Sequence, residues 1–275
     1  MKIGEALRAS AALGLERLDA QVLMLHVLRR EACDRAWLLA HDTDPLEAED
    51  HVRYVELCQR RATGEPVAYI VGRKEFFGME LLVDERVLVP RPDTETLVQW
   101  ALDLLPVDRE SRVIDLGTGS GAIALAIKKS RPRARVEAVD RSEDALAVAR
   151  SNAALHSLDV GFRKADWLAG AADRYDLVVG NPPYIAGNDP HLSALGSEPA
   201  QALVSGADGL DDLRAIVDQA PPCLSQGGWL LLEHGYDQPA AVRGLLEAAG
   251  FANVATRRDL AGNERCSGGQ WLELG

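Results

Sequence analysis

Beyond residue 110, short apolar runs alternate with segments of helical periodicity, and this alternation constrains the fold more than any other feature. The expected strands are 112–116, 135–140, 160–163, 177–180, 229–232 and 253–257. The expected helices are 122–129, 143–152, 210–219 and 239–248. Such alternation is typical of an α/β fold in which βαβ units build a mostly parallel sheet with helices on both faces. Because ligands in these folds bind at the carboxyl ends of the strands, functional residues should directly follow strands.

Residues 1–64 follow a different pattern and predict a small helical bundle. Leu18, Val22 and Leu25 place apolar groups at three- and four-residue steps, as a core-facing helix does. A further helix is expected over 45–61, with Asp44 as its N-cap, Pro45 at its first position and Gly64 as its C-cap.

Residues 65–90 are rich in aromatic and β-branched side chains, and Gly72 and Gly78 interrupt them. This composition indicates one or two β-hairpins that connect the helical domain to the α/β domain. We therefore divide the chain into a helical domain (1–64), a hairpin connector (65–90) and an α/β domain (91–275).

The composition narrows the classes of partner. The formal net charge is −12, whereas proteins that bind long stretches of phosphate backbone usually carry a basic face. The four cysteines are widely spaced, without the pairs that zinc sites need, so we expect no metal. The first residues lack the apolar core of a signal peptide, and no apolar run approaches the roughly 20 residues that span a bilayer. We expect a cytoplasmic monomer that binds neither membrane nor nucleic acid directly.

A glycine-rich segment directly follows the first expected strand, and its residues are Gly117, Thr118, Gly119, Ser120 and Gly121. Glycines let a ligand approach the backbone, and the start of the following helix points free N–H groups at that ligand. Asp140 ends the next expected strand, where a carboxylate can accept hydrogen bonds from both ribose hydroxyls. The segment predicts a nucleotide-type cofactor.

The glycine pattern alone leaves two cofactor classes open, because Gly117, Gly119 and Ala122 also fit the dinucleotide fingerprint. Asp115, just before the glycines, favours S-adenosylmethionine. A carboxylate at that position attracts the positively charged methionine end of this cofactor, whereas it would repel a pyrophosphate. After the third expected strand, Asp166 and Trp167 can bind the amine of an adenine and stack on its ring.

The most informative stretch is Asn181, Pro182, Pro183 and Tyr184, which follows the fourth expected strand. The two prolines hold the loop rigid and leave its carbonyls free to accept hydrogen bonds. The Asn181 side-chain oxygen and the Pro182 carbonyl can together hold the two hydrogens of a planar –NH₂ group, and Tyr184 can cover its flat face. These four residues are the candidates for catalysis and substrate binding, by positioning a poorly nucleophilic nitrogen.

The two motifs together resemble those of methyltransferases that act on exocyclic or amide –NH₂ groups. Other segments narrow the resemblance to the PrmC/HemK family of peptide chain release factor glutamine N5-methyltransferases, and these segments are 90–95, 198–210, 233–235 and 259–265. The resemblance implies a class I, Rossmann-like methyltransferase fold with seven strands. It also implies S-adenosylmethionine as cofactor, contacted by residues 117–121, Asp140, Trp167 and Asn181, with S-adenosylhomocysteine as product. Class 1 release factors are the implied partners, methylated on their Gly-Gly-Gln glutamine. The helical domain would help to grip the release factor.

Two rival interpretations remain. A nucleic-acid N-methyltransferase would place a flipped adenine or guanine amine in the same slot, and an inactive binding module would keep the fold without the chemistry. The acidic net charge opposes the first, and the intact motifs oppose the second. We expect Glu233, His234 and Glu264 to be structural rather than catalytic, and Gly268-Gly269-Gln270 to match the substrate motif by coincidence.

Overall fold

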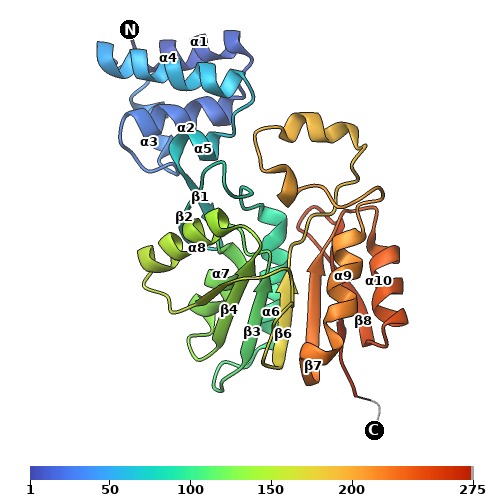
Figure 1. Ribbon diagram of the computed structural model, residues 1–275. Coiled ribbons are helices and arrows are strands. Elements are labelled where there is room, and N and C mark those ends of the chain that lie inside the picture. Colours follow the sequence, from blue (N-terminus) through green and yellow to red (C-terminus); the bar gives the residue numbers. More distant parts are fainter. Residues whose placement is uncertain (274–275) are drawn as a thin grey trace. The chain divides into compact units, whose positions relative to one another are not determined.

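The computed structural model describes residues 1–273, except for the side chains of His191, Ser193 and Ala194. The chain forms two compact units, of which the first is Met1–Arg73 and the second begins at Lys74 (Figure 1). Among the residues described, no helix combines the length and the apolar character needed to cross a membrane.

The first unit is helical, as the sequence predicts. Its helices are α1 (Ile3–Ser10), α2 (Arg17–Val27), α3 (Arg35–Ala40), α4 (Ala48–Ala62) and the short α5 (Val67–Val71), with the 3₁₀ turn η1 (Ala11–Leu13) after α1. Each longer helix contributes apolar side chains to one core, which includes Leu23, Tyr54 and Leu57. Burial of these stripes stabilises helices that would be marginal in isolation.

Two details of this unit differ from the sequence prediction. Helix α4 begins at Ala48 instead of Pro45, its N-cap is Glu47 instead of Asp44, and its C-cap is Thr63 instead of Gly64. The preceding residues pair with the chain's start instead, since Leu46 N–H donates to the Met1 carbonyl at 2.8 Å. The β-branched segment Val67–Val71 is a helix, not a strand, because its one fully buried side chain, Ile70, joins the helical core. Burial in tertiary structure outweighs its strand propensity.

One hairpin is present in the connector, formed by β1 (Arg73–Phe76) and β2 (Met79–Leu82). Phe77 and Gly78 join the strands, and both have positive φ (49° and 70°). Two consecutive left-handed residues are typical of the tight turn that suits the twist of paired strands.

The second unit is built on a seven-stranded sheet of order β5-β4-β3-β6-β7-β9-β8, in which only β9 runs antiparallel to its neighbours. The strands are β3 (Arg112–Leu116), β4 (Arg135–Asp140), β5 (Gly161–Lys164), β6 (Tyr175–Gly180), β7 (Leu224–Glu233), β8 (Ala252–Arg258) and β9 (Glu264–Gln270). This arrangement confirms the expected class I methyltransferase fold. The strand order reverses between β3 and β6, so a crevice for ligands is expected after these two strands.

Alternate side chains of the sheet enter two separate cores. On β6, Leu177 and Val179 belong to the core covered by α6 (Glu95–Leu104) and α7 (Ala122–Ser130), whereas Val178 belongs to the core under α9 (Asp211–Gln219) and α10 (Pro239–Ala248) (Figure 1). Helix α8 (Glu143–Leu155) adds Ala153 to the first core. A sheet buried on both faces is the reason why the strands read as continuous apolar runs.

Some elements were not anticipated from the sequence. Helix α6 was missed, and β9 was expected only as part of a terminal hairpin. The remaining turns of 3₁₀ helix are η2 (Pro92–Thr94), η3 (Pro190–Leu195), η4 (Ala200–Ala202) and η5 (Pro221–Cys223).

Candidate functional site

A pocket of about 650 Å³ opens at the carboxyl ends of the central strands, where the strand order reverses. Seven residues predicted from the sequence line it, namely Gly117, Gly119, Asp140, Asp166, Trp167, Asn181 and Pro183. They come from four different loops, after β3, β4, β5 and β6. The position agrees with the general rule for ligand sites in open α/β sheets.

The glycine loop after β3 is shaped by its own backbone. Gly117 has a φ of +66°, and a Cβ there would stand 3.1 Å from the ring of Trp167. A side chain at this position would therefore be strained and would also displace the aromatic wall of the pocket. Gly119 also has positive φ (+55°), but nothing lies within 4 Å of where its Cβ would be.

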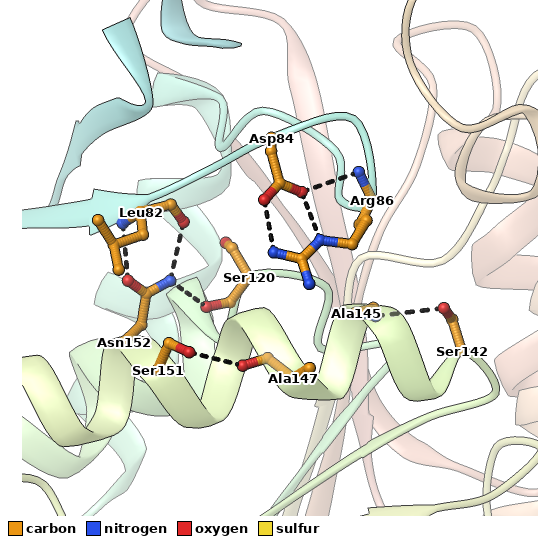
Figure 2. A network of polar contacts seen from close by, with 9 residues as sticks. All are labelled: Leu82, Asp84, Arg86, Ser120, Ser142, Ala145, Ala147, Ser151 and Asn152. Atoms are coloured by element: carbon orange, nitrogen blue, oxygen red, sulfur yellow. Dashed lines mark hydrogen bonds and ion pairs between the residues drawn. The ribbon is translucent and has the colours of Figure 1, made fainter.

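Asp140, at the end of β4, is held by two backbone donors. Its Oδ2 accepts a hydrogen bond from Gly119 N–H at 3.0 Å, and its Oδ1 accepts one from Ser142 N–H at 2.9 Å. Ser142 also caps helix α8, since its hydroxyl accepts a hydrogen bond from Ala145 N–H (Figure 2). The carboxylate is thus fixed in the pocket wall, and each oxygen retains a lone pair for a ligand.

Asp115 is fully buried beside the glycine loop and does not line the pocket surface. Its Oδ2 accepts hydrogen bonds from the Thr118 hydroxyl (2.6 Å) and from Ala124 N–H (3.2 Å), whereas its Oδ1 has no hydrogen-bond partner within the described part of the chain. Burial raises the pKa of this carboxyl to about 7, despite those two donors, and the charge of Asp140 adds to the rise. A cation placed nearby would lower this pKa and stabilise the ionised form.

The other three loop residues predicted from the sequence do not line the pocket, but their contacts hold the glycine loop in place. Thr118 bonds Asp115, the Ser120 carbonyl accepts a hydrogen bond from Asn152, and Gly121 is the N-cap of α7 with a φ of 85°.

Asn152, on α8, ties the connector to the glycine loop. Its side chain exchanges two hydrogen bonds with the backbone of Leu82 (2.7 and 3.0 Å) and donates a third to the Ser120 carbonyl (2.9 Å) (Figure 2). A few residues beyond Leu82, Arg86 lines the pocket, and its guanidinium is paired with Asp84 at 2.6 Å (Figure 2). This fully buried asparagine therefore fixes a segment that forms part of the pocket wall.

The loop after β6 separates two neighbouring pockets. Asn181 lines the first pocket and also a second one of about 670 Å³, which Tyr184, Ile185 and Arg91 line as well. The Asn181 side-chain N–H donates to the Thr94 hydroxyl at 3.2 Å. The Asn181 amide oxygen is consequently the atom left to accept a hydrogen bond from a ligand.

Tyr184 is anchored at both ends. Its carbonyl accepts a hydrogen bond from Gln238 Nε2 (3.0 Å), and its hydroxyl donates to Glu233 Oε1 at 3.4 Å. Gly209 packs so closely that a Cβ there would lie 2.3 Å from the Tyr184 carbonyl oxygen. Of the predicted catalytic residues, only Pro182 lines neither pocket, and it is buried behind the loop.

Sequence reasoning missed Thr94, Gln238, Arg86 and Asn152 as contributors to the site. Thr94 lies within the 90–95 segment that carries the family resemblance. That resemblance was the sequence feature that could have indicated a role for Thr94 in the site. The others lie in ordinary helical or loop sequence, where only the assembled fold brings them to the pocket.

Comparisons with known proteins show which family the chain resembles in each of its two parts. Residues 94–208 match the methyltransferase small domain family, and residues 3–72 match the PrmC N-terminal domain. The chain is 50% identical to the release factor glutamine methyltransferase of Xylella fastidiosa strain Temecula1, over 96% of this chain and 97% of that protein. It is also 50% identical to that of Bordetella pertussis, over 93% and 95%. A solved methyltransferase from Pyrococcus furiosus shares the fold, with a TM-score of 0.56, 17% identity, and coverage of 78% of this chain and 97% of that one.

Proposed function

The chain belongs to the release factor glutamine methyltransferase family, and on that premise we propose how its pockets perform the reaction. The enzyme is a protein-glutamine N5-methyltransferase. We propose that the first pocket binds S-adenosylmethionine and releases S-adenosylhomocysteine, and that the second receives the glutamine of the Gly-Gly-Gln motif of a class 1 release factor. The observation that carries this proposal is that Asn181 lines both pockets.

The residues of the first pocket suit this cofactor. Asp140 offers one free lone pair from each fixed oxygen to a pair of ribose hydroxyls, and Trp167 and Asp166 offer a flat wall and an acceptor to adenine. The glycine loop, residues 117–121, gives the backbone approach. The unpartnered Oδ1 of Asp115 lies just behind that loop, where a positively charged methionine end would relieve the raised pKa of the carboxyl.

The residues of the second pocket suit a primary amide. We propose that the Asn181 amide oxygen accepts one amide hydrogen, while Tyr184 covers the flat face and Pro183 stiffens the turn. We assign the second amide hydrogen to the Pro182 carbonyl, although Pro182 itself lines neither pocket. When bound, the cofactor supplies a methyl group on a sulfonium, a strong electrophile. The amide nitrogen held by Asn181 would accept this methyl group, with the cofactor's sulfur as the leaving group, and would give up one proton to water. The contribution of the chain is to hold nitrogen and methyl in line.

We propose that the helical domain recognises the release factor. A Gly-Gly-Gln loop alone offers little contact area, whereas specific protein recognition usually buries about 800 Å² on each partner. The domain predicted over 1–64 lies within the first compact unit, Met1–Arg73, which has a core of its own. We also retain the expectation that the enzyme acts as a cytoplasmic monomer.

The proposal is tested by incubating the protein with methyl-labelled cofactor and separate pools of class 1 release factor, DNA and RNA. We expect one methyl group on the glutamine of the Gly-Gly-Gln loop, located by mass spectrometry, and none after that glutamine is replaced. Methyl transfer to DNA or RNA with the release factor untouched would favour the nucleic-acid alternative.

A truncated chain that starts at Lys74 tests the role of the helical domain. This boundary retains strand β2, whose Met79 and Leu81 are buried in the core of the second unit. We expect normal cofactor binding but greatly reduced methylation of the intact release factor. An unchanged kcat/KM toward the release factor would contradict a recognition role.

A further inference from the structure

Three segments that carry the family resemblance, 90–95, 233–235 and 259–265, meet behind the catalytic loop although they lie far apart in sequence. Arg265 connects the first and last of them, since its guanidinium lies 3.3 Å from Asp93 and 3.3 Å from Asp259. Thr94, next to Asp93, accepts the hydrogen bond from Asn181. The catalytic loop is therefore supported by a group of polar residues to which the proposed reaction gives no role.

Glu233 lies at the centre of this group, at the end of β7, and is 1% exposed. One of its oxygens accepts a hydrogen bond from the Tyr184 hydroxyl, and the other has no partner among the residues described. Burial raises the pKa of its carboxyl to about 7, while the Thr94 hydroxyl and the Arg265 charge oppose the rise.

Glu198, another buried acid in the same unit, is a useful comparison because its hydrogen bonds are those of a structural residue. Glu198 is 7% exposed and uses both carboxyl oxygens, one to accept from Val89 N–H at 3.1 Å and the other to pair with Arg91. Glu233 differs because one of its buried carboxyl oxygens has no hydrogen-bond partner among the residues described, while the other accepts a hydrogen bond from the Tyr184 hydroxyl. An unsatisfied buried carboxyl oxygen destabilises a fold, so its retention in the core calls for a functional reason.

We propose that Glu233 is a positioning residue for methyl transfer, which fixes the Tyr184 ring against the amide through the Tyr184 hydroxyl. This inference rests on the proposed function, and it replaces the structural role expected for Glu233 from the sequence. The Tyr184 backbone is already held by Gln238, so the freedom that remains is rotation of its side chain. A hydrogen bond at the far end of the ring removes that freedom, and small errors in the placement of reacting groups slow catalysis strongly.

A double-mutant cycle on kcat tests the inference. Glu233→Ala is expected to lower kcat by about 10- to 100-fold, with the cofactor Kd unchanged. Tyr184→Phe, which removes only the hydroxyl, is expected to lower kcat about 10-fold. If Glu233 acts through that hydroxyl, the double variant is no slower than Glu233→Ala alone. Glu233→Gln, which retains an acceptor oxygen, is expected to recover most of the rate.

The inference would be overturned if the fold-loss in kcat of the double variant equalled the product of the losses of the two single variants. A near-normal kcat for Glu233→Ala would also overturn it. Ser267→Ala is the matched control, because Ser267 is buried on the neighbouring strand and its hydroxyl hydrogen-bonds His234 and Thr256, with no hydrogen bond to the catalytic loop among the residues described. This control is expected to lose stability, measured by urea unfolding, and to keep its kcat. If Glu233→Ala does not fold, Glu233→Leu fills the space and completes the same cycle with Tyr184→Phe.

The proposed function and the inference fail in different ways. If the unaltered enzyme leaves the release factor glutamine unmethylated, the proposed function is wrong and the inference falls with it. If the unaltered enzyme methylates that glutamine but the cycle is multiplicative, only the positioning role of Glu233 is wrong.

Discussion

The glycine loop and the catalytic loop follow adjacent strands of one sheet, yet they are held in different ways. In the glycine loop, Thr118 bonds a residue three positions away, and Gly119 bonds one that is 21 positions away. In the catalytic loop, Asn181 bonds Thr94, 87 positions away, and Tyr184 bonds Glu233, 49 positions away. Local contacts form a motif that can be recognised in sequence, whereas distant contacts exist only after the sheet has assembled.

This difference predicts that substitutions in the two loops separate binding from chemistry. Changes in the glycine loop and Asp140 should act on cofactor affinity, and changes in the catalytic loop should act on turnover.

The largest effect is expected for Asn181→Ala, which should lower kcat toward the release factor by on the order of 100-fold or more, because the acceptor that orients the amide is lost. Folding, followed by circular dichroism, should be unaffected. Asn188→Ala, an exposed asparagine a few residues further on, serves as the control and should keep normal turnover. Near-normal turnover of Asn181→Ala would mean that the motif is only a structural turn.

Asn152→Ala should destabilise the protein by about 2–4 kcal/mol, since it leaves the polar groups of Leu82 and the Ser120 carbonyl without partners. The neighbouring Ser151 is exposed and bonds the Ala147 carbonyl one turn earlier in the same helix, so Ser151→Ala should change stability by less than about 0.5 kcal/mol (Figure 2). Urea unfolding of both variants makes the measurement. Equal losses in the free energy of unfolding at the two positions would show that the Asn152 hydrogen bonds do not stabilise the contact between Leu82 and the glycine loop.

Asp140→Ala should weaken the binding of S-adenosylmethionine by about 1–3 kcal/mol, the scale for losing hydrogen bonds to a charged acceptor. Calorimetry gives the affinity, and Asp144→Ala, which removes an exposed acid at the start of helix α8, is the matched control. Unchanged affinity in Asp140→Ala, or tight binding of a nicotinamide dinucleotide to the unaltered protein, would contradict the cofactor assignment.

Gly117→Ala should weaken cofactor binding more than Gly119→Ala does. Both substitutions force an alanine into positive φ, at about 1–2 kcal/mol, but only the first also meets the Trp167 ring. Gly244→Ala, in helix α10 with open space around it, should be neutral or stabilising. Equal losses for the two loop variants would indicate that the Trp167 ring moves freely.

The smallest effect concerns pH. One buried carboxyl lies beside each loop, Asp115 in β3 beside the glycine loop and Glu233 at the end of β7 beside the catalytic loop, and each has its pKa raised to about 7. Both groups have pKa values near 4 when unfolded, so the folded state retains protons that the unfolded state has lost. Their stabilising contribution is complete below about pH 4 and disappears as the pH rises through 7.

Between pH 6 and 8, each carboxyl should therefore lower the free energy of unfolding by about 1 kcal/mol. Glu233→Gln and Asp115→Asn should each flatten this decline in urea unfolding measured across that range. Saturating cofactor should flatten it for Asp115 but not for Glu233, if the cationic end of the cofactor lies near Asp115. The same response at both sites would remove the distinction between the loops.

Much of the second unit could be predicted from the sequence, because its signals are local. The strands 112–116 and 135–140 have the same bounds in sequence and structure, as does helix α10. The expected glycine loop and the residues after β3 to β6 do meet at one pocket. Helix α6 was missed, and the position of Asp115 behind the pocket surface was not foreseen, because burial depends on neighbours that the local sequence does not specify.

The sequence by itself determined the alternation of strands and helices, the glycine loop and the Asn-Pro-Pro-Tyr turn, since each depends on the backbone preferences of adjacent residues. Only the tertiary structure decided how the second loop is supported. Thr94 and Glu233 reach Asn181 and Tyr184 because β6 pairs with β3 and β7 in the sheet and the segment before α6 comes to lie behind the catalytic loop. A hydrogen bond across that many residues requires the cooperative burial of the whole sheet, and no short stretch of sequence encodes it.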